Sequence, residues 1–600
     1  MLAMIASNSW LASDLADLRA YLDALSVQDW AFLAVVYGGG TVAALWAFKN
    51  VSVFCLRQLG LSHPGQYRWF PRLPWRTVLK LWLILKAWRE RVFRFGKQSS
   101  GGFSGALATL TNLYAPGKIL IGRAYGFGLP FLQPLGVKVA RHIKVFAMTG
   151  AGKTTLFISI INCWMGSGLI VDPKGQITEA LAAKDKKRTR FVFDPLGITE
   201  FSCAHFNVFD VIKWAVERGG PDVAVLWAQR IAECLITTPS GAKQPYFYDI
   251  SRGFVTGLIL HVLTTYPEDN HNLPFVRTLI LAGEKVINPD TGEEETEKDE
   301  TFPFLLDCMQ NNHAYDGIVI GAAKALETAG KETLGNILST LLEQTKWLDV
   351  PAIRRVLLRS DFSLADLKTR NDVALSLVAP VLSVREELRD CFRLILNISA
   401  YIFEAEQQKN GQCLFVVDEL PSLGYNPVFE VIVPVARSQG ITFCGISQDI
   451  EILKKAYPQS WESFIGNADI VIWMGSNHEA TLQYLSGVLG YRTLVEKDRR
   501  TGRKNYRQVR VAEADQLRRF LDPNGERIII TRAGKRAIKA VNEPYYKALP
   551  VTHYAPDPDH REPFLRRLMR RLIALFTEQK TKAKTDLNTP QPTAMEADNE

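Results

Sequence analysis

Residues 147–155 have the residue types and spacing of a phosphate-binding loop. Residues 143–146, three of which are apolar, predict a short strand, the loop follows directly, and a helical pattern begins after it. Glycines let backbone N–H groups close around phosphate oxygens, and the N-terminus of the following helix adds its positive dipole. In this Walker A arrangement Lys153 reaches the β and γ phosphates and Thr154 offers its hydroxyl to Mg²⁺. The predicted nucleotide-binding residues are Thr149, Gly150, Ala151, Gly152, Lys153, Thr154 and Thr155.

A second motif supports this interpretation. Residues 413–417 predict a buried strand that ends in Asp418 and Glu419, as a Walker B strand does. We expect Asp418 to hold Mg²⁺ together with Thr154, and Glu419 to orient and deprotonate the attacking water. The alternatives are a plain turn before a helix for the first motif, where Ala147 replaces the usual first glycine, and a core strand with a surface acidic pair for the second. Both motifs in this order predict ATP hydrolysis with Mg²⁺.

Two further polar residues are candidates for the catalytic set. Arg437 precedes the predicted strand 441–446, where a ring ATPase presents an arginine finger to its neighbour. The alternative is a surface arginine that caps a helix. Gln448 follows the same strand, which is the next one after the Walker B strand, and is expected to sense the γ-phosphate.

The candidate residues lie far apart in the sequence, so they can form one site only if a sheet brings the ends of their strands together. Residues 169–172, 191–194, 373–378, 441–446, 470–474 and 528–531 are rich in β-forming side chains and lie between helical patterns. They predict a mainly parallel α/β sheet wrapped by helices, with its phosphate site at the carboxyl ends of the strands. Within 220–366 the pattern is helical instead, at 223–236, 248–263, 317–329 and 333–348. An acidic stretch, 293–300, interrupts it and is expected to be a solvated loop.

Composition excludes several classes of protein. Of the 600 residues 47% are hydrophobic and 22% charged, which excludes a disordered chain and a polytopic transporter. The eight cysteines stand singly with no CxxC pair, which excludes a disulfide scaffold and a zinc-finger framework and suits the reducing cytoplasm. The formal net charge of +9 only weakly favours an anionic partner.

The N-terminal region contains a candidate membrane anchor. Residues 30–48 are free of charge and long enough for one transmembrane helix, although a buried core helix or an uncleaved signal sequence has similar composition. Acidic residues precede this segment and many Lys and Arg follow it, so the positive-inside rule places the C-terminal part in the cytoplasm. The expected order is a short extracytoplasmic segment 1–29, the transmembrane helix 30–48 and a basic juxtamembrane linker 49–100. The predicted location is the bacterial inner (cytoplasmic) membrane, in contact with lipid.

Several basic stretches lie elsewhere. The runs 184–190 and 497–504 could contact a polyanion, but neither contains a stacking aromatic residue and ordinary solvated loops are the alternative. Residues 561–600 predict a basic amphipathic helix followed by a disordered tail, because the composition turns polar and small.

With these motifs in place, the sequence resembles the type IV coupling proteins, the TraG/TraD-like ATPases of conjugation and type IV secretion. The segments that carry the resemblance are 143–155, 168–175, 193–195, 206–210, 337–340, 360–368, 418–424, 440–448, 485–490 and 544–546. The resemblance implies a RecA-like P-loop nucleotide-binding domain in two parts, 101–219 and 367–560, interrupted by an all-α domain, 220–366. It also implies a hexameric ring that uses ATP and Mg²⁺. The implied partners are single-stranded DNA with its relaxase and the inner-membrane components of a type IV secretion channel.

The sequence departs from the family pattern at the anchor, because family members commonly have two membrane spans and only one is found here. Two other functions stay open. One is a receptor platform that recruits secreted protein effectors and pumps no DNA. The other is a chromosome translocase of the FtsK or HerA kind, against which segments 361–368 and 485–490 argue.

Overall fold

The computed structural model describes residues 103–555, except 105–111, 113, 116, 126–133, 140, 183–187, 240–243, 285–300, 409–410, 498–503 and 549–553. The predicted segments 1–29, 30–48, 49–100 and 561–600 lie outside these residues and stay predictions, as does the acidic loop 293–300. Among the helices that are described, none combines the length and the apolar character that crossing a membrane requires.

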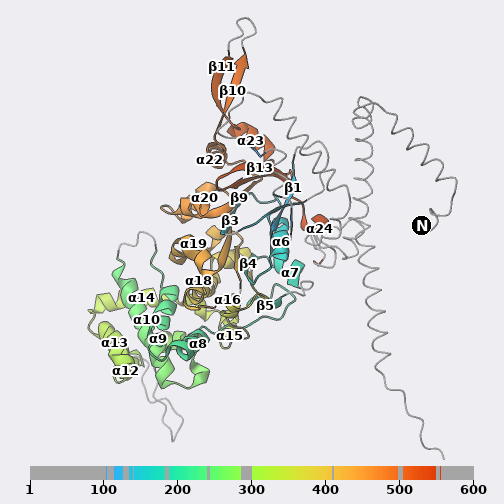
Figure 1. Ribbon diagram of the computed structural model, residues 1–600. Coiled ribbons are helices and arrows are strands. Elements are labelled where there is room, and N and C mark those ends of the chain that lie inside the picture. Colours follow the sequence, from blue (N-terminus) through green and yellow to red (C-terminus); the bar gives the residue numbers. More distant parts are fainter. Residues whose placement is uncertain are drawn as a thin grey trace, which may run out of the picture.

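One large mixed sheet organises the described chain (Figure 1). Its parallel part has the order β9 (Ala468–Met474), β3 (His142–Ala147), β8 (Ile441–Ser447), β7 (Cys413–Val417), β4 (Gly168–Pro173), β6 (Val373–Ala379) and β5 (Thr189–Phe193). The antiparallel part continues beyond β9 through β12 (Arg527–Arg532), β13 (Lys535–Val541), β1 (Ile119–Ala124) and β2 (Pro134–Val137). The predicted α/β sheet is confirmed, whereas β1, β2 and β13 were not predicted.

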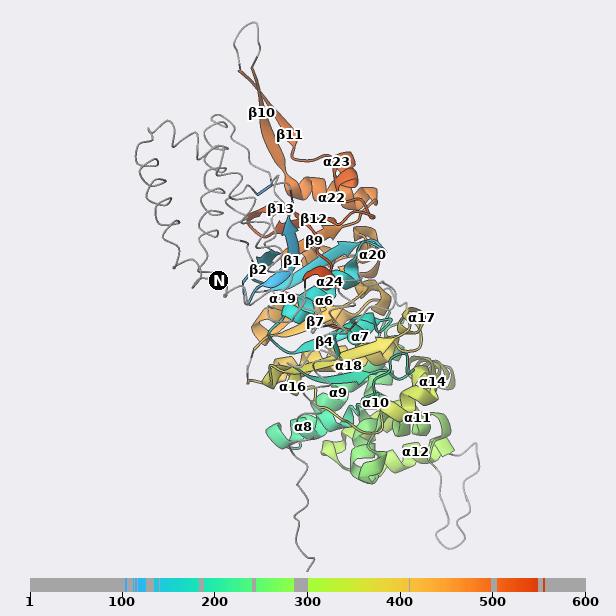
Figure 2. The same cartoon turned by 90° about the vertical axis from the view of Figure 1, so that its right-hand side faces the viewer.

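Helices cover both faces of the sheet (Figures 1 and 2). On one face α6 (Lys153–Cys163) and α7 (Gln176–Ala182) share a buried apolar cluster with β3, β4 and β7. On the other face the cluster includes α18 (Arg389–Ala405), α19 (Pro427–Gln439), α20 (Ile450–Ala456), α21 (Trp461–Gly466) and α22 (Glu479–Leu489). Burial on both faces explains the continuous apolar runs of the central strands.

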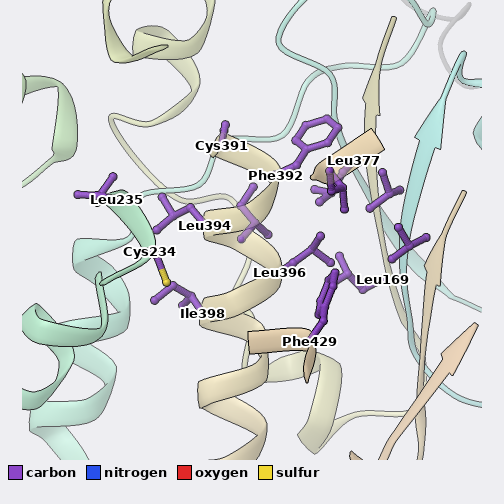
Figure 3. Close-up of a cluster of buried hydrophobic side chains, with 14 of the residues drawn as sticks. Leu169, Cys234, Leu235, Leu377, Cys391, Phe392, Leu394, Leu396, Ile398 and Phe429 are labelled. Carbon is purple, nitrogen blue, oxygen red and sulfur yellow. The ribbon is translucent and has the colours of Figure 1, made fainter. Parts of the chain in front are cut away.

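The α18 helix is buried between two partners (Figure 3). Its Phe392 and Leu396 lie towards strand residues such as Leu377, and its Leu394 and Ile398 lie towards Cys234. Cys234 belongs to α9 (Val223–Leu235), a helix of the block described next. Because α18 is apolar on both of these sides, it joins the sheet to that block.

The described residues between β5 and β6 form a helical block without a strand. Its α-helices are α8 (Phe209–Gly219), α9, α10 (Tyr246–Thr265), α11 (Leu273–Ala282), α12 (Thr301–Gln310), α13 (Ile318–Glu327), α14 (Lys331–Gln344), α15 (Pro351–Val356) and α16 (Asp366–Thr369). The central helix α10 packs against α9, α13 and α14. It approaches α13 so closely that a Cβ at Gly257 would lie 2.3 Å from the Cβ of Ala322, so only glycine fits there. Helices occupy the region where the all-α domain is predicted, although its boundaries stay a prediction.

A separate two-stranded ribbon projects from the body (Figure 1). Strands β10 (Tyr491–Lys497) and β11 (Lys504–Arg510) pair along their whole length, and α23 (Ala514–Phe520) follows them. The last described helix is α24 (Tyr545–Ala548), which contacts α6. The turn of the ribbon, within the basic run 497–504, lies outside the described residues, so its contact with a polyanion stays untested.

Candidate nucleotide-binding site

The phosphate-binding loop connects β3 to α6 and has the backbone shape that its glycines allow. Gly150 and Gly152 both have φ of +85°, in the left-handed region that favours glycine. The N–H of Ala151 donates to the carbonyl of Met148 at 3.2 Å, and α6 begins at Lys153 directly after the second glycine. The predicted binding residues therefore surround the N-terminus of a helix of 11 residues, whose free N–H groups and dipole favour an anion.

An asparagine that was not predicted supports this loop. Asn542 directly follows β13 and is buried. Its Nδ2 donates to the carbonyl of Gly152 at 3.3 Å and to Oγ1 of Thr155 at 3.4 Å. The only sequence signal was a polar residue at the end of a strand, and that strand was not predicted.

The carboxyl ends of the parallel strands gather the other predicted residues. Because β8 lies between β3 and β7 in the sheet, the loop after β3, Gln448 after β8, and Asp418 and Glu419 after β7 share one edge. This edge brings the Walker A and Walker B residues together in one chain.

The charges of the two motifs act on each other. Burial raises the pKa of the Asp418 carboxyl to about 6, and the negative charge of Glu419 adds to the rise. The positive charges of Lys153 and Lys174 oppose this rise. A divalent cation at this place would favour the carboxylate further, so the donor set of Asp418 and the Thr154 hydroxyl at the start of α6 fits Mg²⁺.

A second acidic side chain is buried near the carboxyl end of a neighbouring strand. Asp172, at the end of β4, is buried, and burial raises its pKa to about 7 with a contribution from the charge of Asp418. Its Oδ2 accepts hydrogen bonds from the N–H and the hydroxyl of Thr178, both at 2.8 Å. These bonds tie β4 to α7, which gives Asp172 a structural role at the site.

The Glu419 carboxylate is held by two donors. Its Oε1 accepts from Nε2 of Gln448 at 2.9 Å and from Nη2 of Arg385 at 3.1 Å. Gln448 was predicted as a sensor, whereas Arg385 was not predicted at all. Glu419 itself has φ of +65°, which is rare for a residue with a Cβ and marks a constrained position.

Arg437 is not brought to this edge. It lies exposed in the last turn of α19, just before β8 begins, and thus at the amino ends of the parallel strands. Its side chain makes no hydrogen bond or ion pair within the described part of the chain. The end of a helix on the surface also fits the alternative of a surface arginine that caps a helix, so the arginine finger stays a prediction.

A buried lysine supports the strand that carries Gln448. Lys144, in β3, is 1% exposed, and its Nζ donates to Oγ of Ser447 at 2.7 Å. Burial lowers the pKa of Lys144 to about 7 from its ordinary 10.5. The bond fixes the end of β8 directly before Gln448.

The low pKa of Lys144 predicts a pH-dependent stability. The folded chain loses this proton at lower pH than the unfolded chain, so the contribution of Lys144 to stability rises from pH 7 towards pH 10.5. We expect Lys144→Met to be more stable than the wild type at pH 7. This advantage should shrink by up to about 1.4 kcal/mol per pH unit above pH 7. Thermal midpoints at pH 7 and pH 9 measure it, with the exposed Lys535→Met as the control. If the difference in thermal midpoint between Lys144→Met and the wild type were the same at both pH values, the lowered pKa of Lys144 would be contradicted.

Comparison with known proteins gives the family. A sequence model described as "Type IV secretory system Conjugative DNA transfer" matches residues 113–585. The conjugal transfer protein TraG of Escherichia coli is 25% identical over 372 residues, which is 59% of this chain and 56% of that protein. TraG of Rhizobium radiobacter is 23% identical over 397 residues, 64% of this chain and 58% of that protein. The chain thus spans little more than half the length of the relatives it matches.

Solved structures show the same fold. The bacterial conjugative coupling protein TrwB, in complex with sulphate, has a TM-score of 0.55 at 14% identity, over 74% of this chain and 94% of that chain. The plasmid coupling protein TrwB in complex with ADP and Mg²⁺ has a TM-score of 0.53 at 14% identity, over 75% and 95%. The resemblance predicted from the sequence is confirmed, and because the family match covers most of the chain, this protein belongs to the conjugative DNA transfer family of type IV secretory systems, the type IV coupling proteins.

Proposed function

We propose that this protein hydrolyses ATP with Mg²⁺ to drive relaxase-bound single-stranded DNA, and protein substrates with it, into a type IV secretion channel. The observation that carries the proposal is the common edge of β3, β8 and β7, where the phosphate-binding loop meets Asp418, Glu419 and Gln448. The likeness to TrwB, solved with ADP and Mg²⁺ and with a non-hydrolysable ATP analogue, supports nucleotide and magnesium as ligands.

Each residue has a distinct task in this proposal. The N–H groups at the start of α6 and the ammonium of Lys153 bind the phosphates. Thr154 and Asp418 hold Mg²⁺, which neutralises charge on the phosphate oxygens when it is bound. Glu419 orients the attacking water and accepts its proton, and Gln448 moves from Glu419 to the γ-phosphate when ATP is present.

The assembly is proposed as a hexameric ring. Arg437 supports this part because its side chain is exposed at the opposite edge from the loop of its own chain, where a neighbouring chain could meet it. The proposed location is the inner membrane, anchored by residues 30–48 and in contact with lipid and with inner-membrane components of the channel. The +9 net charge is compatible with DNA but does not identify it.

ATP hydrolysis by the full 600-residue chain, with and without single-stranded DNA, tests the proposal. We expect DNA to raise the turnover rate, and the rise to weaken with added salt because phosphate contacts release counterions. Lys153→Ala is the control that removes turnover by this site. If the wild-type hydrolysis rate were the same with and without single-stranded DNA at every salt concentration, DNA pumping would be contradicted and the receptor platform for protein effectors would be favoured.

A further inference from the structure

Arg385 lies beside the predicted catalytic base but belongs to none of the nucleotide-binding motifs. It is the last residue of α17 (Val381–Arg385), which follows β6 and packs against α18 and the short 3-10 helix Leu420–Leu423 after Glu419. In the sheet β4 separates β6 from β7, so Arg385 reaches Glu419 across a strand. Its guanidinium Nη2 lies 3.1 Å from Oε1 of Glu419.

The two carboxylate oxygens of Glu419 differ in their hydrogen bonds. Oε1 accepts from both Arg385 and Gln448, while the described residues offer no hydrogen bond to Oε2. The backbone is fixed separately, because the Glu419 carbonyl accepts from the N–H of Ser422 at 2.8 Å and from its hydroxyl at 2.7 Å. With one oxygen held and the backbone fixed, the other oxygen is the one available to a water molecule.

The two donors to Oε1 are not equivalent. In the proposed function Gln448 leaves Glu419 for the γ-phosphate when ATP binds, which would leave Arg385 as the donor that keeps the carboxylate in place. Arg389, the next arginine along the chain, bonds the Asp390 carboxylate instead, with Nε 3.2 Å from Oδ1. The Arg385 side chain is 49% exposed, so its ion pair contributes little to stability and its main effect is on orientation.

We propose that Arg385 is a positioning residue that holds Oε1 of Glu419, so that Oε2 faces the attacking water. The inference rests on the proposed ATP hydrolysis and adds a residue to that site. A displacement of about 1 Å in a catalytic group can lower a rate about 10²-fold, so loss of the donor should slow the chemical step. Nucleotide binding, which uses the loop at β3 and α6, should be unaffected.

Steady-state ATP hydrolysis by the full chain tests this role. We expect Arg385→Gln to lower kcat about 10- to 100-fold with KM changed less than about twofold, because the loss is confined to the transition state. Arg385→Lys should recover much of the rate, since only one guanidinium nitrogen contacts Glu419 and an ammonium can donate from the same side. Arg389→Gln is the matched control, an arginine of similar exposure that does not contact Glu419, and should keep the wild-type rate.

A double variant separates positioning from a general structural effect. If Arg385 acts through Glu419, Arg385→Gln should cost no further rate in a Glu419→Gln background, whereas independent effects would multiply. An unchanged kcat in Arg385→Gln, no recovery with lysine, or multiplied losses in the double variant would each overturn the inference and leave the proposed function standing. A wild-type chain that hydrolyses no ATP would overturn both.

Discussion

Replacing Glu419 by glutamine is expected to slow ATP hydrolysis about 10²- to 10⁴-fold, the range that general-base catalysis contributes. Glutamine keeps the size of the side chain and can still accept from Gln448 and Arg385 through its carbonyl oxygen. It cannot accept the proton of the attacking water. The rate is measured with saturating ATP and Mg²⁺, and nucleotide affinity is measured separately by equilibrium binding.

The matched control is Glu386→Gln, which removes an exposed carboxylate that directly follows α17. It should leave the rate unchanged. A Glu419→Gln chain that hydrolyses ATP at the wild-type rate would show that another group accepts the proton.

Removing Arg437 is expected to lower the rate about 10³- to 10⁵-fold, as loss of an arginine finger does in related phosphoryl-transfer enzymes. The large effect is expected because the guanidinium would stabilise charge on the transferring phosphate of the next subunit. Nucleotide binding by the chain that carries Arg437→Ala should persist, since its own loop is intact. Hydrolysis by Arg437→Ala alone, and by its mixtures with Glu419→Gln, measures this effect.

Mixing makes the test specific for action between chains. Some interfaces in a mixed ring pair an intact Glu419 with an intact Arg437 of the neighbour, so two inactive variants should partly restore each other. Arg519→Ala, which changes an exposed arginine in the last turn of α23, serves as the control and should stay active by itself. Failure of every mixing ratio to recover activity would count against a finger in trans.

The parallel half of the sheet could be predicted because its strands are buried on both faces. Strands β7 and β8 are buried along their whole length; β7 is an uninterrupted apolar run, and β8 is mostly apolar with Thr442 and Ser447 as its polar residues. In the antiparallel half β12 gave this signal and was predicted, whereas β13 and β2 lacked it. In β13 exposed and buried residues mix, with Lys and Arg at its start, and β2 has only four residues and begins with proline.

The site residues likewise fall into two groups: those that a contiguous motif in the sequence predicts, and those that only the tertiary structure brings to the site. Lys153, Asp418 and Glu419 were predicted because each motif is contiguous and its chemistry depends on spacing along the chain. Arg385 and Asn542 were missed because they reach the site only through the order of strands in the sheet. No spacing rule connects β6 with the Walker B strand, or β13 with the phosphate-binding loop.

The burial of α18 on two sides has a mechanical consequence. This helix begins four residues after Arg385 and, with 17 residues, extends about 25 Å at 1.5 Å per residue. One side is packed on the sheet and the other on α9 of the helical block (Figure 3). Close-packed interiors resist compression and transmit displacement. A shift of α17 at the nucleotide edge would therefore press on a close-packed helix that contacts both the sheet and the helical block.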